Sequence, residues 1–123
     1  MKTLMSILAV LLLLGVATAQ VFVTNNVTRA AAIKVASQLR VGMWEEDASK
    51  LVAKHSLTNA VGIGAVAGWG RFYTLADGTS LVLDYRAREI ARDGRWGGNG
   101  ELQRAFIQSN GVNIVFITLT NTP

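Results

Sequence analysis

The side chains of this chain that could do chemistry are few and widely spaced. His55 is the only histidine and cysteine is absent, which argues against a histidine-based metal site and removes thiolate zinc sites and cysteine nucleophiles. Ser56 follows His55 directly, but a neighbour in sequence is not positioned as a nucleophile for that base. We interpret His55 as a helix-end residue that faces the core or interacts with the helix dipole. The sequence predicts no catalytic residue, no metal ligand and no cofactor.

The acidic residues of the predicted strands do not form a catalytic pair. Asp77 precedes Gly78 and is typical of a tight turn. Asp84 lies in the middle of a predicted strand, where a carboxylate needs solvent or a partner, and we expect Arg71 or Arg104 to supply it. A glycosidase-like pair would need a second facing acid, and the strands offer only Glu101, at an end.

A glycine-rich stretch, Gly62-Ile63-Gly64-Ala65-Val66-Ala67, matches the form of a dinucleotide-binding fingerprint. That fingerprint has meaning only between a strand and a helix of a βαβ unit. Here a predicted helix precedes it and strands follow. We therefore predict that Ser56–Gly70 is a flexible loop.

A second long loop, Ala87–Gly100, is the better functional candidate, because loops of this length are often functional. It is rich in arginine and glycine and contains a tryptophan. Arginine and tryptophan are enriched at the energetic centres of protein interfaces. The residues that we predict to bind a partner are Arg86, Arg88, Arg92, Arg95 and Trp96. The net charge of +4 is too small to indicate nucleic-acid binding.

The first residues have the three parts of a secretory signal. A short basic start is followed by the apolar stretch Leu4–Val16 and by the small residues Ala17-Thr18-Ala19. We predict a signal peptide over 1–19 that is cleaved after Ala19, which makes the protein secreted or periplasmic. The alternative is an uncleaved anchor over Leu4–Val23, and membrane association is expected only in that case.

The remaining chain predicts a short N-terminal segment, 20–27, and a single domain, 28–123. Alanine content and charge placement predict helices over Arg29–Leu39 and Trp44–His55. Asp77-Gly78 and Asn110-Gly111 predict two hairpin turns. The predicted strands are Trp69–Ala76, Ser80–Arg86, Glu101–Ser109 and Val112–Thr120. The last is apolar on both faces, so we expect it to be central or covered on both sides. The predicted fold class is α+β, with two N-terminal helices packed on a four-stranded antiparallel sheet.

Two segments carry a resemblance to a known family. Leu39-Arg40-Val41-Gly42-Met43-Trp44-Glu45-Glu46-Asp47-Ala48 resembles the helix-turn-helix signature of the SmpA/OmlA (BamE-like) family, and Phe72–Tyr85 resembles its first hairpin. The layout is also similar to the beta-lactamase-inhibitor-protein-like fold. The resemblance implies helices on an antiparallel sheet, a role in envelope assembly and no enzymatic activity. The family's outer-membrane lipoproteins carry a cysteine that this chain lacks.

We therefore expect a non-enzymatic exported binding module, acting in envelope assembly or protein interaction. Its exposed sheet face and the Arg86–Trp96 region would contact a protein partner or an anionic envelope component. The alternatives are a small extracytoplasmic enzyme or enzyme inhibitor acting on envelope polymers, and a domain anchored by its leader.

Overall fold

The computed structural model describes residues 24–65, 67–87 and 100–120. These residues form two helices and five strands. The helices are α2 (Arg29–Ala36) and α3 (Glu45–Lys54). The strands are β1 (Val61–Ala65), β2 (Gly68–Thr74), β3 (Ser80–Ala87), β4 (Gly100–Ser109) and β5 (Val112–Ile117). The predicted leader lies outside the described residues.

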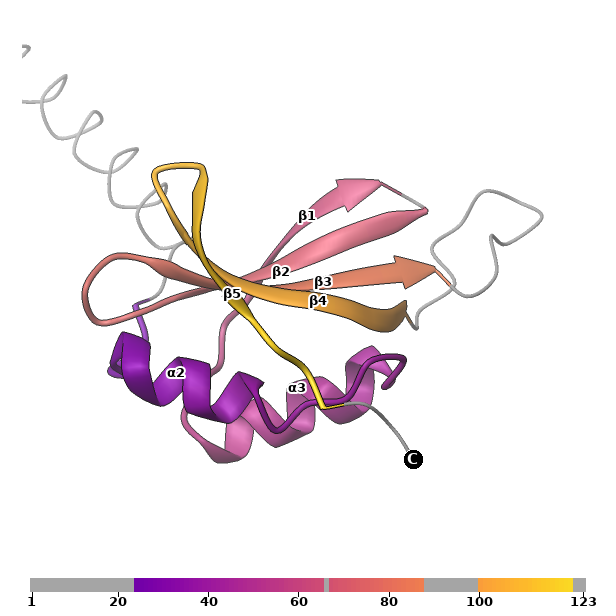
Figure 1. The fold of residues 1–123 in the computed structure, drawn as a ribbon, viewed down its shortest axis with the longest axis horizontal. Coiled ribbons are helices and arrows are strands. Elements are labelled where there is room, and N and C mark those ends of the chain that lie inside the picture. The colour runs from indigo at the N-terminus through magenta and orange to yellow at the C-terminus, as the bar shows by residue number, and fades with distance from the viewer. Residues whose placement is uncertain (1–23, 66, 88–99, 121–123) are drawn as a thin grey trace, which may run out of the picture.

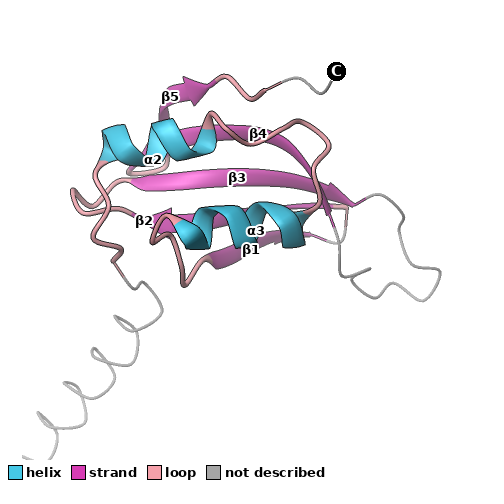
Figure 2. Ribbon diagram, turned by 90° about the horizontal axis from the view of Figure 1, so that it is seen from below, coloured by secondary structure: helices cyan, strands magenta, loops and turns pink. Residues whose placement is uncertain are grey.

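The strands form one antiparallel sheet in the order β1-β2-β3-β4-β5, so each strand pairs with the next along the chain. Both predicted hairpins are confirmed. Gly78 has a φ of 84°, and Asn110 and Gly111 have φ of 50° and 78°, the positive values that tight hairpin turns require. The sheet is strongly twisted, and both helices lie on one of its faces (Figures 1 and 2).

The prediction of a four-stranded sheet under a pair of N-terminal helices is wrong in two respects. The sheet has a fifth strand, β1, in the stretch predicted to be a loop. The two helices do not pack as a pair, because each makes its main contacts with the sheet. The coarser prediction, α+β with an antiparallel sheet, is confirmed.

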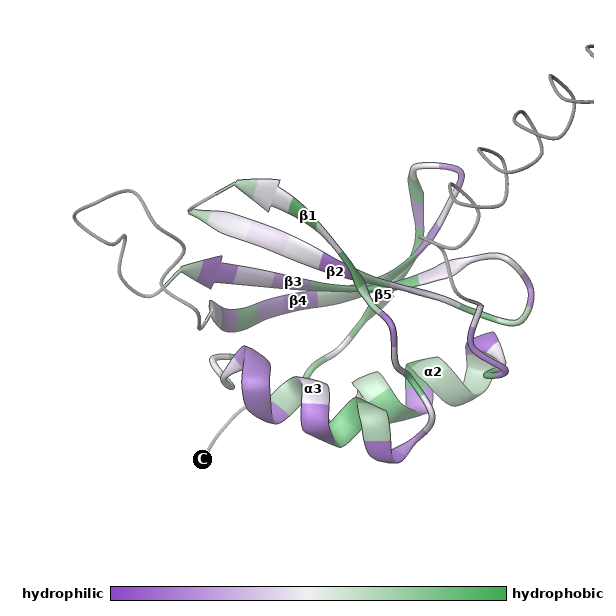
Figure 3. Cartoon of the chain, turned by 180° about the vertical axis from the view of Figure 1, so that it is seen from behind, coloured by the Kyte–Doolittle hydropathy of each residue, from purple (hydrophilic) through white to green (hydrophobic). Residues whose placement is uncertain are grey.

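The two helices begin close to where the sequence predicts. The hydroxyl of Thr28 accepts a hydrogen bond from the Ala31 amide at 3.1 Å, which caps α2. This helix ends at Ala36, three residues earlier than predicted. Three acidic residues occupy the first turn of α3, where the helix dipole favours negative charge. α2 is mostly hydrophobic, whereas α3 carries both hydrophilic and hydrophobic residues (Figure 3).

The core lies between the helices and the sheet. It includes Ala32 and Leu39 from the α2 side, Ala48 and Val52 from α3, and inward residues of the strands. The α2–α3 connection is held against β4, since the Gly42 amide donates to the Leu102 carbonyl at 2.7 Å. His55 follows α3 and is exposed, so it does not face the core.

The position of β5 also differs from the prediction. This strand forms an edge of the sheet rather than its centre, and Val112, Ile114 and Phe116 are exposed. Ile107 pairs with Val115 and Gln108 with Asn113, so Ile114 is an extra residue on β5. It forms a β-bulge, which bends the strand.

Candidate binding surface

We call the sheet face opposite the helices the open face. Side chains alternate between the two faces along each strand. Arg71 and Tyr73 point toward the helices, since Arg71 binds Glu45 of α3 and Tyr73 belongs to the core. Phe72, between them, therefore points to the open face.

An apolar row crosses the open face from one edge of the sheet to the other. Paired residues on neighbouring strands have side chains on the same face, and the register joins five such residues in a line. The row consists of Val61, Phe72, Val82, Phe106 and Phe116. Exposure differs along the row. Val82 at its centre is 1% exposed, so neighbouring side chains shield it, whereas Phe116 at its end is 70% exposed. The row thus presents aromatic surface that neither α2 nor α3 covers.

Glycine and aromatic contacts shape this row. A Cβ atom on Gly70 would lie 2.9 Å from a ring carbon of Phe72, so the absent side chain makes room for that ring. The rings of Phe106 and Phe116 are 6.2 Å apart at an interplanar angle of 52°, within the range for favourable aromatic pairs. Phe106 and Phe116 therefore pack on each other at the exposed end of the row.

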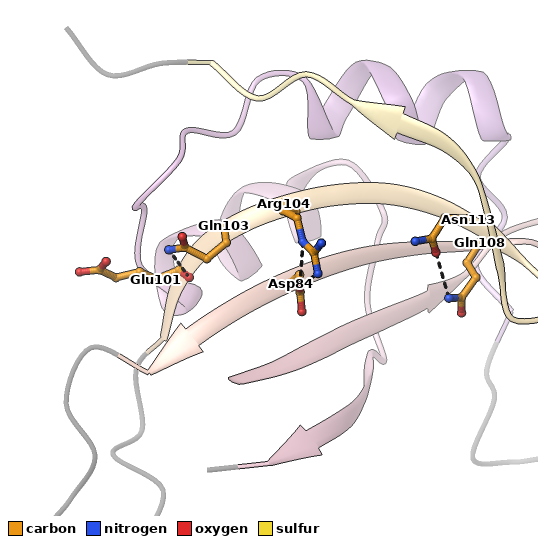
Figure 4. Close-up of polar contacts among 6 residues, drawn as sticks. All are labelled: Asp84, Glu101, Gln103, Arg104, Gln108 and Asn113. Carbon is orange, nitrogen blue, oxygen red and sulfur yellow. Dashed lines mark hydrogen bonds and ion pairs between the residues drawn. The ribbon is translucent and has the colours of Figure 1, made fainter. Parts of the chain in front are cut away.

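An ion pair lies beside the apolar row. Arg104 Nη2 is 2.6 Å from Asp84 Oδ2, so Arg104 is the partner that Asp84 requires and Arg71 is not. The same guanidinium lies 5.9 Å from the Phe106 ring centroid, a cation–π contact. Figure 4 shows this pair between β3 and β4, with Gln108 and Asn113 hydrogen-bonded further along the sheet.

The predicted partner-binding residues are only partly located. Arg86 is exposed on β3, paired in register with Glu101, and lies on the open face two residues from Asp84. Arg88, Arg92, Arg95 and Trp96 lie outside the described residues. Sequence reasoning missed Arg104 and Phe116 as surface residues. The alternation Arg104-x-Phe106-x-Gln108 could have indicated that the arginine and the phenylalanine share a face.

A second polar cluster lies on the helix side of the sheet. Glu45, at the start of α3, is 9% exposed. One carboxylate oxygen accepts a hydrogen bond from Trp69 Nε1 at 2.6 Å, and the other accepts from Arg71 Nε at 2.7 Å. The Trp69 ring stacks on Tyr85 with centroids 6.5 Å apart. Glu45 thus joins the first turn of α3 to β2.

This cluster borders an open pocket of about 260 Å³ lined by α3, the segment after it and β2. Burial raises the pKa of the Tyr73 hydroxyl, which Ser49 hydrogen-bonds. Burial also raises the pKa of Tyr85, whose hydroxyl has no hydrogen-bond partner among the described residues. Both tyrosines therefore stay protonated, and the one carboxylate at the pocket already binds two partners.

The described segments contain no group of three or more histidine, cysteine or acidic side chains arranged to hold a metal ion. Among the helices in those segments, none is long and apolar enough to cross a membrane.

Comparison of the chain with protein-family models, with curated proteins and with solved structures finds no match. The resemblance to the SmpA/OmlA family therefore stays a prediction.

Proposed function

We propose that this protein is a non-enzymatic, exported binding module that holds a protein partner on the open face. The apolar row is the observation that carries the proposal. An apolar row that crosses five strands, contains three phenylalanines and ends on a phenylalanine 70% exposed has the composition of the centre of a protein interface. Exposed apolar patches of this kind mark interaction sites.

Arginines supply a polar border to this surface. Arg104 is exposed beside the apolar row, and Arg86 is exposed on the same face, four residues along β3 from Val82. The chain continues from Arg86 into the predicted arginine and tryptophan residues. Arginine forks and aromatic anchors together favour a partner with an apolar centre and acidic groups around it. An anionic envelope component is the second candidate, favoured by the same two exposed arginines.

An enzymatic role finds less support in the arrangement of the carboxylates. Asp84 is bound to Arg104, and Glu45 is bound to Trp69 and Arg71. A general acid or base must be able to exchange its proton with substrate. Both carboxylates are already bound by cationic or N–H donors.

Site-specific photo-crosslinking in the producing cell tests the proposal. A photoreactive residue at Phe116 or Arg86 should give adducts with the same partner, identified by mass spectrometry. The matched control is Ala30, which is exposed on α2 in the helix layer. Equal adducts from Ala30, or adducts that contain this chain alone, would contradict binding of a partner on the open face.

The arginine loop is tested by combining this assay with substitution. The double change Arg92→Ala and Arg95→Ala should reduce the Phe116 adduct several-fold, because removal of interface arginines commonly weakens binding by 1 kcal/mol or more, roughly a factor of five. Unchanged adduct yield would remove the loop from the proposed interface.

A further inference from the structure

Within the described residues, the edge strand β1 lacks the features that normally protect the edge of a sheet. Edge strands of monomeric proteins are blunted by charged residues, proline, bulges or covering segments. β1 has the sequence Val-Gly-Ile-Gly-Ala, without a charge or a proline. Its five residues pair with β2 in unbroken register, so it has no bulge. Ile63, at its centre, is 56% exposed.

The opposite edge is protected. β5 carries the bulge at Ile114, and just beyond it the Thr120 amide donates to the Leu39 carbonyl at 2.8 Å, so the α2–α3 connection covers the chain that follows. In the described residues, β1 has backbone pairing with β2 only. The unprotected edge of this sheet is therefore β1.

The glycines of β1 leave room for residues of the neighbouring strand β2. A Cβ atom on Gly62 would lie 2.7 Å from Arg71 Nη1, and one on Gly64 would lie 2.5 Å from the Trp69 Cα. Because these positions carry no side chain, the helix-side surface of β1 is bare backbone. A strand approaching this edge would meet no side chain there.

The residue order of β1 favours a second copy of the same strand. The sequence is nearly symmetric about Ile63, with a glycine on each side and a small apolar residue at each end. Antiparallel pairing about a two-fold axis at Ile63 would set glycine opposite glycine and Val61 opposite Ala65. Isologous contacts of this kind close at two subunits.

Charge also favours a second copy. Ser56 to Gly70 contains no charged residue, and the nearest cation, Arg71, is neutralised by Glu45 at 2.7 Å. Two copies of a chain with net charge +4 would therefore meet at an uncharged edge, without like charges in the strand pair.

We propose that β1 pairs with β1 of a second copy, giving a two-fold dimer with one continuous ten-stranded sheet. The apolar rows of both open faces would then lie on the same side of this sheet, with the Phe116 residues at its outer ends. The dimer uses the edge of the sheet and is independent of the partner proposed for the open face.

Disulfide trapping tests this arrangement, because the chain has no cysteine of its own. Residues facing each other across an antiparallel pair have Cα atoms about 4.5–5.5 Å apart, a separation that a disulfide spans. Ile63→Cys should form a disulfide-linked dimer under mild oxidation of the protein recovered after expression of the full chain. The control Ile114→Cys, an exposed isoleucine on the protected edge, should stay unlinked. Equal linking by both variants, or none by Ile63→Cys, would overturn the proposal.

Sedimentation across a concentration series gives an independent measurement. The unchanged chain should sediment as a dimer, Ile63→Lys as a monomer and Ile114→Lys as a dimer, with circular dichroism confirming that each is folded. A monomeric unchanged chain, or loss of the dimer with Ile114→Lys, would overturn the proposal. Photo-crosslinking from Phe116 to the partner should persist in Ile63→Lys. Sedimentation therefore tests the dimer, and photo-crosslinking separately tests partner binding on the open face.

Discussion

Glu45 joins the first turn of α3 to β2 through both oxygens of its carboxylate. Its carboxylate binds the Trp69 indole and the Arg71 guanidinium while almost buried. A buried charge that loses its partner is costly, whereas an exposed ion pair contributes little. The neighbouring Glu46, paired with Lys50 at 3.1 Å and 63% exposed on its side chain, has the same chemistry in solvent. The two residues therefore provide a matched comparison.

Glu45→Gln should lower the free energy of unfolding by about 1–3 kcal/mol, the range for leaving a buried partner unsatisfied. Arg71 is partly exposed, which keeps the loss at the lower end of that range. Glu46→Gln should change stability by less than about 0.5 kcal/mol. Urea unfolding followed by tryptophan fluorescence measures both, and equal effects would show that burial of Glu45 carries no extra stability.

Asp77 gives the fold a pH-dependent contribution. Its carboxylate accepts a hydrogen bond from the Thr79 amide at 3.0 Å and pairs with Arg29 at 2.9 Å. Hydrogen bonds from Thr79, and then the charge of Arg29, lower the pKa of Asp77 below its ordinary value of 3.8. Because the folded-state pKa is depressed, the stabilisation is present above pH 3.8 and is lost as the pH falls through the folded-state pKa.

Asp77→Asn should therefore reduce stability at neutral pH. Below about pH 4 the variant should lose less stability on acidification than the unchanged chain does. Thermal unfolding midpoints measured from neutral pH to strongly acidic pH check this. Asp47→Asn, on an exposed position of α3, serves as the control. Parallel pH profiles for Asp77→Asn and the unchanged chain would contradict the prediction.

The strands show how far local sequence can predict this fold. Asp77-Gly78 and Asn110-Gly111 specify their turns through local backbone conformation and, at Asp77, a local side-chain hydrogen bond, so both hairpins follow from the sequence. The strand β1 does not, because Gly62 and Gly64 weaken any local preference for a strand. Those glycines are explained only by Arg71 and Trp69 on the neighbouring strand. The edge position of β5 was also missed, since exposed apolar residues on an edge look like a buried strand in sequence.

Gly62 and Gly64 of β1 should differ in how much a substitution by alanine destabilises the fold. Gly64→Ala places a Cβ 2.5 Å from backbone, whereas Gly62→Ala meets the end of the Arg71 side chain, which can move. We expect Gly64→Ala to destabilise the fold by about 1–3 kcal/mol through overpacking and Gly62→Ala to cost less. Urea unfolding of both variants decides this, and a reversed order would mean that β1 does not lie against Trp69 as described.

The candidate surface shows a similar division between local and long-range information. Arg86 was predicted from residue type and is exposed on the open face, two residues along β3 from Asp84. The row itself depends on the register of five strands, which places Val61 and Phe116 in one line although they are 55 positions apart in the sequence (116 minus 61). No window of sequence shows that alignment.

The start of the described chain is held to the domain by Asn25. Asn25, 5% exposed, donates from its backbone and side-chain nitrogens to the Thr74 carbonyl at 2.8 and 3.1 Å. Its side-chain oxygen accepts from the Thr58 amide at 3.0 Å. Asn25 thus joins the entry of the domain to β2 and to the segment before β1. A cut after Ala19 would leave all of these bonds in place.

We therefore expect the exported chain to begin at Gln20 and to be as stable as the chain that keeps its leader.

Asn25→Ala should lower the free energy of unfolding by about 1–3 kcal/mol, because the Thr58 amide loses its acceptor. The exposed neighbour Asn26 gives the control, and Asn26→Ala should change stability by less than about 0.5 kcal/mol. N-terminal sequencing of the exported chain tests the cleavage site, and urea unfolding measures the stability of the two asparagine variants. An intact leader on the exported chain would favour the anchor, and equal effects of the two asparagine changes would remove Asn25 from its structural role.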